Sequence, residues 1–198
     1  MTSHKISLVK PSPVRKVAVF CGAKTGNDPL YLNQAIIVGA FLAKNGIELI
    51  YGGSNLGLMG ALASSALSHG GAVTGVVPTH FEKSETIQEN LTQLIEVNDL
   101  SERKEQMLSL ADGFVALPGG SGTLDEIFEV ITLSQMGQHK KPCAFLNINQ
   151  FYDPLISFLR HAQENGFIHP DYINMLIVSE SIEDTINRMQ CFKHPHLS

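Results

Sequence analysis

The sequence has no tryptophan, only three cysteines and no long apolar segment. Cys21, Cys143 and Cys191 lie far apart and are odd in number, so they match neither a disulfide framework nor a metal-binding pair, and we expect three buried, reduced thiols. The one close pair of histidines, His194 and His196, lies in a terminal stretch that we expect to fray. The sequence therefore predicts no metal site.

Basic residues are too few and too scattered to follow a nucleic-acid backbone: 14 Lys and Arg stand against 19 Asp and Glu, for a formal net charge of −5. No run of ~20 apolar residues could span a membrane, and residues 1–10 lack the apolar stretch of a secretory signal. We therefore expect a cytoplasmic protein whose partners include neither a nucleic-acid polymer nor a membrane.

What the sequence does have is the composition of a globular protein, with 43% hydrophobic and 17% charged residues in 198. A chain of this length buries roughly 70% of the surface that its unfolded form exposes, so one core is expected. We predict a flexible leader over residues 1–15, a single domain over 16–192 and a tail over 193–198.

Short apolar runs alternate with helical patterns throughout this domain. The predicted strands are Lys16–Cys21, Glu48–Tyr51, Val73–Val77, Leu94–Val97, Gly113–Leu117, Cys143–Leu146 and a short one around Ile177. The predicted helices run from Pro29 toward Asn45, over Leu58–His69 and Asp99–Leu110, from Thr123 to about Met136, and over Phe151–Asn165 and Ser181–Phe192. This alternation predicts a Rossmann-like, doubly wound α/β fold, in which helices cover both faces of a mostly parallel sheet in three layers.

In such a fold, ligands bind beyond the carboxyl ends of the strands, where the strand order reverses. Three loops that follow strands are therefore candidates: Gly22–Asp28, Gly52–Gly60 and Pro118–Thr123. The polar segment Thr79–Asn90 is either a lid beside the site or a plain surface excursion.

The strongest candidate is the glycine-rich turn that follows a predicted strand and precedes a helix. Its glycines let backbone amides approach an anion without interference from a Cβ atom, and the helix N-terminus favours negative charge. No Gly-Lys-Thr follows, so it is not a Walker loop. We predict phosphate binding here, by Pro118, Gly119, Gly120, Ser121, Gly122 and Thr123.

Each of these patterns also has a purely structural interpretation. Thr123-x-x-Glu126 is a good capping box, although capping does not require three glycines. The glycines of the loop 52–60 fit tight strand-to-helix packing as well as a ligand. Arg103 and Lys104, which gain nothing from the dipole at the start of a helix, have either a specific partner or a solvated face. The apolar helix from Ile127 to Met136 is buried in the core or between subunits.

Together these segments resemble a known family. YGGSNLGLMG at Tyr51–Gly60, the helix with Arg103-Lys104, and PGGSGTLDE followed by EVITLSQMGQHKKP are similar to the LOG (Lonely Guy) family, formerly labelled lysine decarboxylases, from about Val17 to about Ser179. The resemblance implies a cytokinin riboside 5'-monophosphate phosphoribohydrolase, which hydrolyses the N-glycosidic bond of an adenine-type nucleotide to free base and ribose 5-phosphate. It also implies a homodimer and no cofactor.

Carried over to this chain, the resemblance places the catalytic pair on Arg103 and Glu126. Glu126 would stabilise the cation-like sugar and orient or deprotonate the attacking water, while Arg103 would hold the nucleotide. The implied substrate-binding residues are Gly22, Gly53, Met59, Lys104, Pro118, Gly119, Gly120, Ser121, Gly122 and Thr123.

The chain departs from the family pattern at two places. Leu100-Ser101-Glu102 stands where many members have Met-His-x, and Ala23-Lys24 where they have paired serines. These positions leave open the preferred base, AMP or a prenylated adenine ribotide, and Lys24 is either a phosphate contact or an exposed loop lysine. From a different functional class, the same loops would suit a non-catalytic carrier of a phosphorylated cofactor, such as a molybdenum-cofactor carrier.

Overall fold

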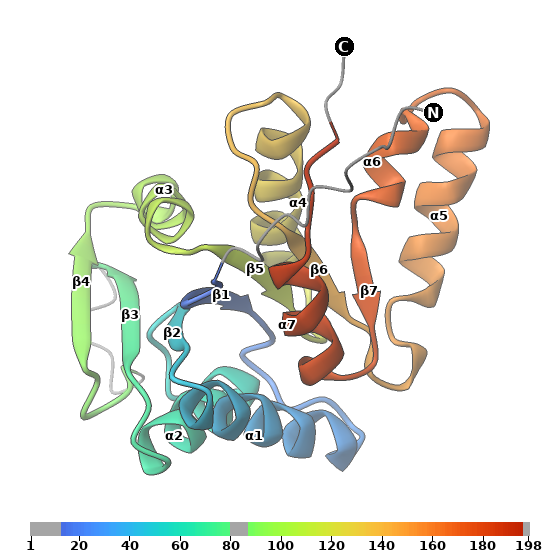
Figure 1. Cartoon of the computed structure of the whole chain (residues 1–198). Helices are drawn as coiled ribbons and strands as arrows, with labels where there is room; N and C mark the ends of the chain where they lie inside the picture. Colours follow the sequence, from blue (N-terminus) through green and yellow to red (C-terminus); the bar gives the residue numbers. More distant parts are fainter. Residues whose placement is uncertain (1–12, 80–86, 196–198) are drawn as a thin grey trace, which may run out of the picture.

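The computed structural model describes residues 13–79 and 87–195, shown in Figure 1. Seven strands, all paired in parallel, form one sheet in the order β4-β3-β2-β1-β5-β6-β7. The strands are β1 Lys16–Phe20, β2 Glu48–Tyr51, β3 Val73–Pro78, β4 Gln93–Val97, β5 Gly113–Ala116, β6 Cys143–Leu146 and β7 Ile177–Ser179. The predicted Rossmann-like, doubly wound fold is confirmed.

Helices cover both faces of this sheet, which makes the three predicted layers (Figure 1). The helices are α1 Pro29–Lys44, α2 Gly57–Ser68, α3 Leu100–Leu110, α4 Ser121–Gln135, α5 Asp153–Glu164, α6 Pro170–Asn174 and α7 Ile182–Gln190. One apolar layer joins the sheet to α1, α2 and α7, and a second joins it to α3, α4 and α5. Asp28 and Asp99 cap α1 and α3 as predicted, because their side chains accept the amides of Leu30 and Glu102.

The inner strands are apolar on both sides because both faces of the sheet are covered there, whereas the edge strand β4 is largely exposed. In β1, Val19 packs in one layer and its neighbour Phe20 in the other, and the exposed fractions of these side chains are 1% and 3%. Ile127 and Ile131 of α4 are also buried within this chain. One face of the apolar helix 127–136 therefore packs in the core, whereas Met136 at its end is 66% exposed.

Two short elements lie where the sequence predicted none. A 3-10 turn, η2 Ile148–Gln150, precedes α5, so this helix begins at Asp153 rather than at Phe151, and α6 follows it. In η2, Asn149 and Gln150 adopt left-handed backbone angles, with φ of 49° and 59°. Side chains other than glycine adopt this region rarely, so no local sequence pattern predicts the turn.

Both ends of the domain differ from expectation. Val14 is buried and the Arg15 amide donates to Asp112 Oδ2 at 2.9 Å, so the packed chain begins before Lys16; residues 1–12 lie outside the described part. Cys21 and Cys143 are buried as predicted, but Cys191 is exposed because it ends α7 at the surface. His194 does not fray, since its Nε2 lies 3.1 Å from Ser134 Oγ, whereas His196 lies outside the described residues.

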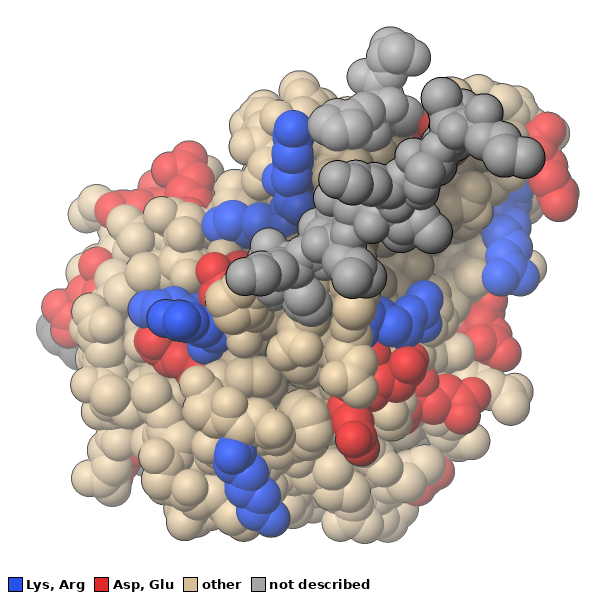
Figure 2. All heavy atoms as spheres, in the orientation of Figure 1, with Lys and Arg blue, Asp and Glu red and all other residues tan. Residues whose placement is uncertain are grey.

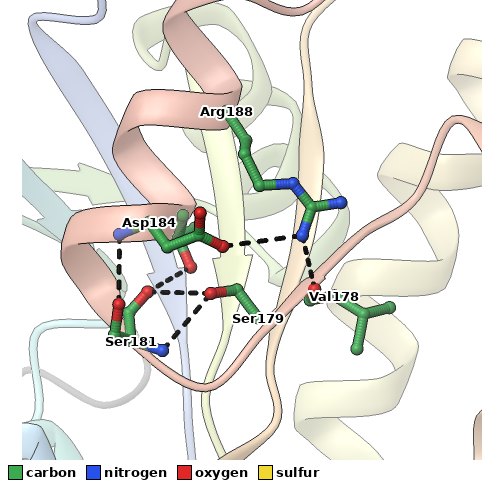
Figure 3. A network of polar contacts seen from close by, with 6 residues as sticks. Val178, Ser179, Ser181, Asp184 and Arg188 are labelled. Carbon is green, nitrogen blue, oxygen red and sulfur yellow. Dashed lines mark hydrogen bonds and ion pairs between the residues drawn. The ribbon is translucent and has the colours of Figure 1, made fainter.

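The edge strand β7 is covered by polar contacts from α7, drawn in Figure 3. Arg188 Nη1 donates to the Val178 carbonyl at 2.6 Å and lies 3.6 Å from Asp184 Oδ2, while Ser181 Oγ accepts the Asp184 amide. An unpaired carbonyl on an edge strand invites pairing with another chain. Arg188 occupies that carbonyl and so protects this edge.

The strand order reverses between β1 and β5. From β1 the chain proceeds outward through β2, β3 and β4 on one side, and from β5 through β6 and β7 on the other. The loops that follow β1 and β5 therefore lie side by side at the carboxyl ends of these strands and lead to helices on opposite faces of the sheet, which is where a ligand site is expected in an open α/β sheet. These are the loop 22–28 and the turn Pro118–Thr123.

Charges of both signs are interspersed over the face in Figure 2, and the described Lys and Arg side chains there form no continuous stripe. Across residues 13–79 and 87–195, no helix is long and apolar enough to cross a membrane. In the same ranges, no group of three or more His, Cys, Asp or Glu side chains is placed to hold a metal ion.

Candidate active site

A cavity of about 620 Å³ opens at the strand-order reversal, above the turn Pro118–Thr123. The turn leads directly into α4, whose N-cap residue is Gly120 and has no capping side chain. The first intrahelical acceptor serves Leu124, whose amide donates to the Gly120 carbonyl at 3.1 Å. The amides of Ser121, Gly122 and Thr123 therefore have no helical acceptor, and they stand at the positive end of the helix dipole.

The three glycines of this turn have different reasons to be glycine. A Cβ atom on Gly120 or Gly122 would meet no atom within 4 Å, so these two glycines leave the space above the helix end open. A Cβ atom on Gly119 would instead overlap Thr123 Oγ1, and Thr123 is buried. Gly119 is thus required by packing within the turn, which the sequence analysis did not foresee.

Arg103 and Glu126 meet in the wall of this cavity. Arg103 Nη1 lies 2.7 Å from Glu126 Oε1, and the two side chains are 14% and 11% exposed. Arg103 Nε also donates to the Val76 carbonyl at 3.0 Å, and its Nη2 lies where a Cβ on Gly52 would be. The guanidinium is therefore fixed on three sides, and the alternative of a solvated face is wrong for Arg103.

Glu126 does not belong to a capping box. The helix begins two residues before Thr123, so Thr123 lies inside the first turn and Glu126 projects from the second. Burial raises the pKa of the Glu126 carboxyl above its ordinary value, and the positive charge of Arg103 opposes this rise only in part. A carboxylate with a raised pKa holds a proton more readily, which suits general acid–base chemistry.

Lys104 faces α4 rather than the cavity. Its Nζ lies 3.1 Å from Asp125 Oδ2 and contacts Glu129 as well, and only 19% of the side chain is exposed. Lys104 is absent from the residues that line the cavity, and it is not a solvated lysine either. It joins α3 to α4 beside the Arg103–Glu126 pair, through the two carboxylates Asp125 and Glu129 of α4.

Gly22 and Met59, two more of the predicted substrate-binding residues, lie at the same opening. The Gly22 amide donates to the Pro118 carbonyl at 3.1 Å, and the Gly22 carbonyl accepts the Leu58 amide. These two bonds tie the loop after β1 to the turn Pro118–Thr123 and to the start of α2. Met59 lines the large cavity with Gly22 and the turn. Lys24 is exposed at the rim.

The glycines of the loop 52–60 serve mainly close packing. Gly53 has a φ of 78° and its Cβ would overlap Val77, and a Cβ on Gly57 or Gly60 would overlap neighbouring backbone. Tight packing of strand, loop and helix, one of the two interpretations of this run, is therefore confirmed at these positions. Gly52 and Gly53 also line a cavity, described next.

A second cavity, of about 290 Å³, adjoins the first and shares Ala23, Met59 and Arg103 with it. Its remaining lining residues are mostly apolar: Gly52, Gly53, Ser54, Val77, Pro78, Ile87 and Leu100. Ile87 belongs to the segment Thr79–Asn90, of which residues 80–86 lie outside the described part; it pairs with Ser54 through an isolated antiparallel bridge. Arg103 thus stands between an apolar cavity and the glycine turn.

Sequence analysis missed three residues of the large cavity. Tyr31 from α1 and Phe151 after η2 form one wall, with ring centroids 5.7 Å apart. Cys21 lies at the end of β1, and burial raises its thiol pKa, with a smaller contribution from the charge of Glu126. No motif marks these residues, because the fold brings them together from separate segments.

Comparison with known proteins gives consistent results. Residues 59–189 match the model of a family described as "Possible lysine decarboxylase". The chain is 45% identical over 178 residues to the cytokinin riboside 5'-monophosphate phosphoribohydrolase of Rhodococcoides fascians, covering 89% of each chain. It is 36% identical to that of Arabidopsis thaliana, over 93% of this chain and 87% of the relative.

Solved structures share the fold at lower sequence identity. A molybdenum cofactor binding protein from Rippkaea orientalis superposes with a TM-score of 0.67 at 22% identity, over 93% of this chain and 98% of the other. The molybdenum cofactor carrier protein of Chlamydomonas reinhardtii gives 0.66 at 21% identity, over 90% and 98%. These structures are similar to this chain in fold.

Proposed function

The chain belongs to the LOG family, whose relatives are named cytokinin riboside 5'-monophosphate phosphoribohydrolases, and we propose on this premise that it hydrolyses the N-glycosidic bond of adenine-type nucleoside 5'-monophosphates. One observation from the structure carries the proposal to particular residues. The Arg103–Glu126 pair and the open N-terminus of α4 line a single cavity. The products are free base and ribose 5-phosphate.

In the proposed complex, the 5'-phosphate lies on the turn Pro118–Thr123. The amides of Ser121, Gly122 and Thr123 donate to its oxygens, and the absence of a Cβ at Gly120 and Gly122 lets the phosphate approach. Lys24 at the rim adds a positive charge.

The chemical step is assigned to Glu126. A water oxygen forms a bond to the anomeric carbon while the bond to the base nitrogen breaks, and the bonding electrons leave with the base. Glu126 takes a proton from this water and stabilises the cation-like sugar. Arg103, held by Glu126 and the Val76 carbonyl, orients the carboxylate and the nucleotide. The base leaves with a proton gained from solvent or from a neighbouring group.

The second cavity supports binding of the base end. It begins at Met59 and Arg103 and is lined mostly by apolar groups, including Val77 and Leu100. A prenyl substituent on the base would bury apolar surface there, while AMP would leave the cavity unfilled. We therefore propose a preference for prenylated adenine ribotides, with AMP as a slower substrate.

Two other activities make different predictions. A carrier of a phosphorylated cofactor would bind its ligand without turnover, and the solved structures named for that role share the fold with this chain at 21–22% identity. Lysine decarboxylation, named in the family description, would release carbon dioxide from lysine. The Arg103–Glu126 pair counts against the carrier, because binding without turnover needs no general base.

We also propose a homodimer in the cytoplasm, following the family resemblance. Sedimentation equilibrium of the purified chain measures its oligomeric state directly. A monomer at the concentration used for activity assays would contradict it.

The test of the function is chromatographic detection of free base from isopentenyladenosine monophosphate and AMP. We expect release by the wild type and a loss of at least roughly a hundredfold in Glu126→Gln, which keeps the shape but cannot accept the proton. Full activity in Glu126→Gln would remove Glu126 from the chemical step. Release of carbon dioxide from lysine, or release of free base from neither nucleotide, would contradict the proposed reaction.

A further inference from the structure

The hydroxyl of Tyr152 contacts the backbone at the base of the phosphate turn. It donates to the Leu117 carbonyl at 2.6 Å, and Leu117 immediately precedes Pro118. Both residues are buried, with exposed fractions of 2% and 0%. A buried carbonyl that lost this donor would have no water to replace it, so the contact constrains the point where the turn begins.

Tyr152 is itself held by a relay from the far edge of the sheet. Its amide donates to Asn147 Oδ1 at 2.7 Å, and Asn147 Nδ2 donates to Asp153 Oδ1 at 2.7 Å. The Asn147 amide in turn donates to the Ser179 carbonyl at the end of β7. The Asn147 side chain therefore holds the Tyr152 backbone through Oδ1, and its own orientation is fixed by the bond from Nδ2 to Asp153.

The unusual turn η2 places this tyrosine. Left-handed backbone at Asn149 and Gln150 brings Phe151 and Tyr152 back against the sheet, and such backbone persists where its surroundings hold it. The Tyr152 ring packs edge-on against Phe145, with centroids 4.9 Å apart, while Phe151 lines the cavity. The ring is therefore fixed independently of its hydroxyl.

The opposite side of the turn is fixed by the strand β1. The Leu117 amide donates to the Phe20 carbonyl at 2.9 Å, and the Gly22 amide donates to the Pro118 carbonyl. Between these bonds, the orientation of the peptide that joins Leu117 to Pro118 depends on the hydrogen-bond donor that the Leu117 carbonyl contacts. Tyr152 is the donor that it meets.

We infer that Tyr152 is a positioning residue for phosphate recognition, acting through the Leu117 carbonyl on the turn Pro118–Thr123. The inference rests on the proposed function, in which the 5'-phosphate binds this turn. It predicts that loss of the Tyr152 hydroxyl weakens binding of ligands that carry the phosphate and leaves unchanged the binding of ligands that lack it. A residue that only stabilised the fold would affect both kinds of ligand alike.

The test compares Tyr152→Phe with Tyr51→Phe. Tyr51 is also fully buried, but its hydroxyl has no hydrogen-bond partner among the described residues, so it is a matched control. Titration calorimetry measures binding of AMP and of adenosine to each variant and to the chain with wild-type Tyr152, all in the Glu126→Gln background so that AMP is not hydrolysed. We expect Tyr152→Phe to weaken AMP binding roughly three- to tenfold, the effect of one lost hydrogen bond, and to leave adenosine binding unchanged. Tyr51→Phe leaves both unchanged.

Steady-state kinetics supply the second readout. With the nucleotide substrate, KM rises in Tyr152→Phe by a similar factor, while kcat stays within about twofold, because the Arg103–Glu126 pair is untouched. Asp153→Ala, which removes the acceptor for Asn147 Nδ2 at an exposed position, shifts AMP binding in the same direction by a smaller factor.

The outcomes separate the inference from the proposed function. If the chain with wild-type Tyr152 binds AMP no more tightly than adenosine, the phosphate site and the inference both fall. If that chain prefers AMP and Tyr152→Phe keeps the preference, the inference alone is overturned. Equal weakening of AMP and adenosine by Tyr152→Phe would assign the hydroxyl a structural role and would likewise overturn it.

Discussion

Replacement of Arg103 by alanine leaves a buried carboxylate without its partner. Glu126 is 11% exposed, and Arg103 supplies both its ion pair at 2.7 Å and the positive charge that lowers its pKa. The variant also removes the donor to the Val76 carbonyl. The free energy of unfolding should therefore fall, and it should fall in a way that depends on pH.

The magnitude follows from the burial of the pair. Removal of one partner from a buried ion pair costs roughly 3–5 kcal/mol, and the residual exposure of both side chains reduces this to about 2–4 kcal/mol at neutral pH. Without Arg103, the pKa of Glu126 rises further above its ordinary value. Below the ordinary carboxyl pKa, Glu126 is protonated in both the folded and the unfolded chain, so the charge-related cost disappears. The cost grows as pH rises through the window between the unfolded and the folded pKa.

The assay is urea unfolding of wild type, Arg103→Ala, Glu126→Gln and the double variant at pH of about 5 and about 8. We expect Arg103→Ala to lose more stability at the higher pH, and the double variant to lose less than the sum of the single variants, because the unpaired charge is gone. Equal destabilisation of Arg103→Ala at both pH values, or additivity in the cycle, would refute the argument that Glu126 is charged, buried and dependent on Arg103.

Three further predictions concern the neighbours of this pair. Gly122→Ala should raise the free energy of unfolding, measured with urea, by about 0.5–1 kcal/mol because alanine favours the helix and its Cβ meets no atom, yet it should weaken nucleotide binding measured by calorimetry. A variant that is more stable and also binds the nucleotide more tightly would contradict the phosphate site. Lys104→Met removes a charge that lowers the pKa of Glu126, so the acid limb of the pH–activity profile should move to higher pH, and an unmoved limb would rule out this coupling. Leu100→Trp, at a 51% exposed position beside the second cavity, should change stability by less than about 0.5 kcal/mol and should slow isopentenyladenosine monophosphate roughly tenfold more than AMP; equal slowing would place the prenyl group elsewhere.

The sheet and its large helices could be predicted from the sequence because their signals are local. Apolar runs such as Val73–Val77 and caps such as Asp28 and Asp99 specify their own elements. The turn η2 could not be predicted, since its left-handed residues are held by tertiary contacts through Asn147 and Tyr152. The strand order, and with it the meeting of the loops after β1 and β5, is likewise set by pairing between distant segments.

The candidate site was predictable where residues are close in sequence to a glycine turn. The family resemblance implies Arg103 and Glu126 as the catalytic pair, and only the fold places their side chains in contact. Lys104 was expected at the substrate and instead joins two helices, because the direction of a side chain on α3 depends on where α4 packs. Tyr31, Phe151 and Tyr152 carry no motif, and their contribution depends on packing alone.

The most direct test of the central claim is the product balance from a purified nucleotide. The wild type is incubated with isopentenyladenosine monophosphate, and free base and ribose 5-phosphate are quantified together by chromatography, with the corresponding nucleoside in parallel. Hydrolysis at the phosphate turn predicts both products in equal amounts from the nucleotide and little or none from the nucleoside. Tight binding of the nucleotide without either product, or equal cleavage of the nucleoside, would contradict the account.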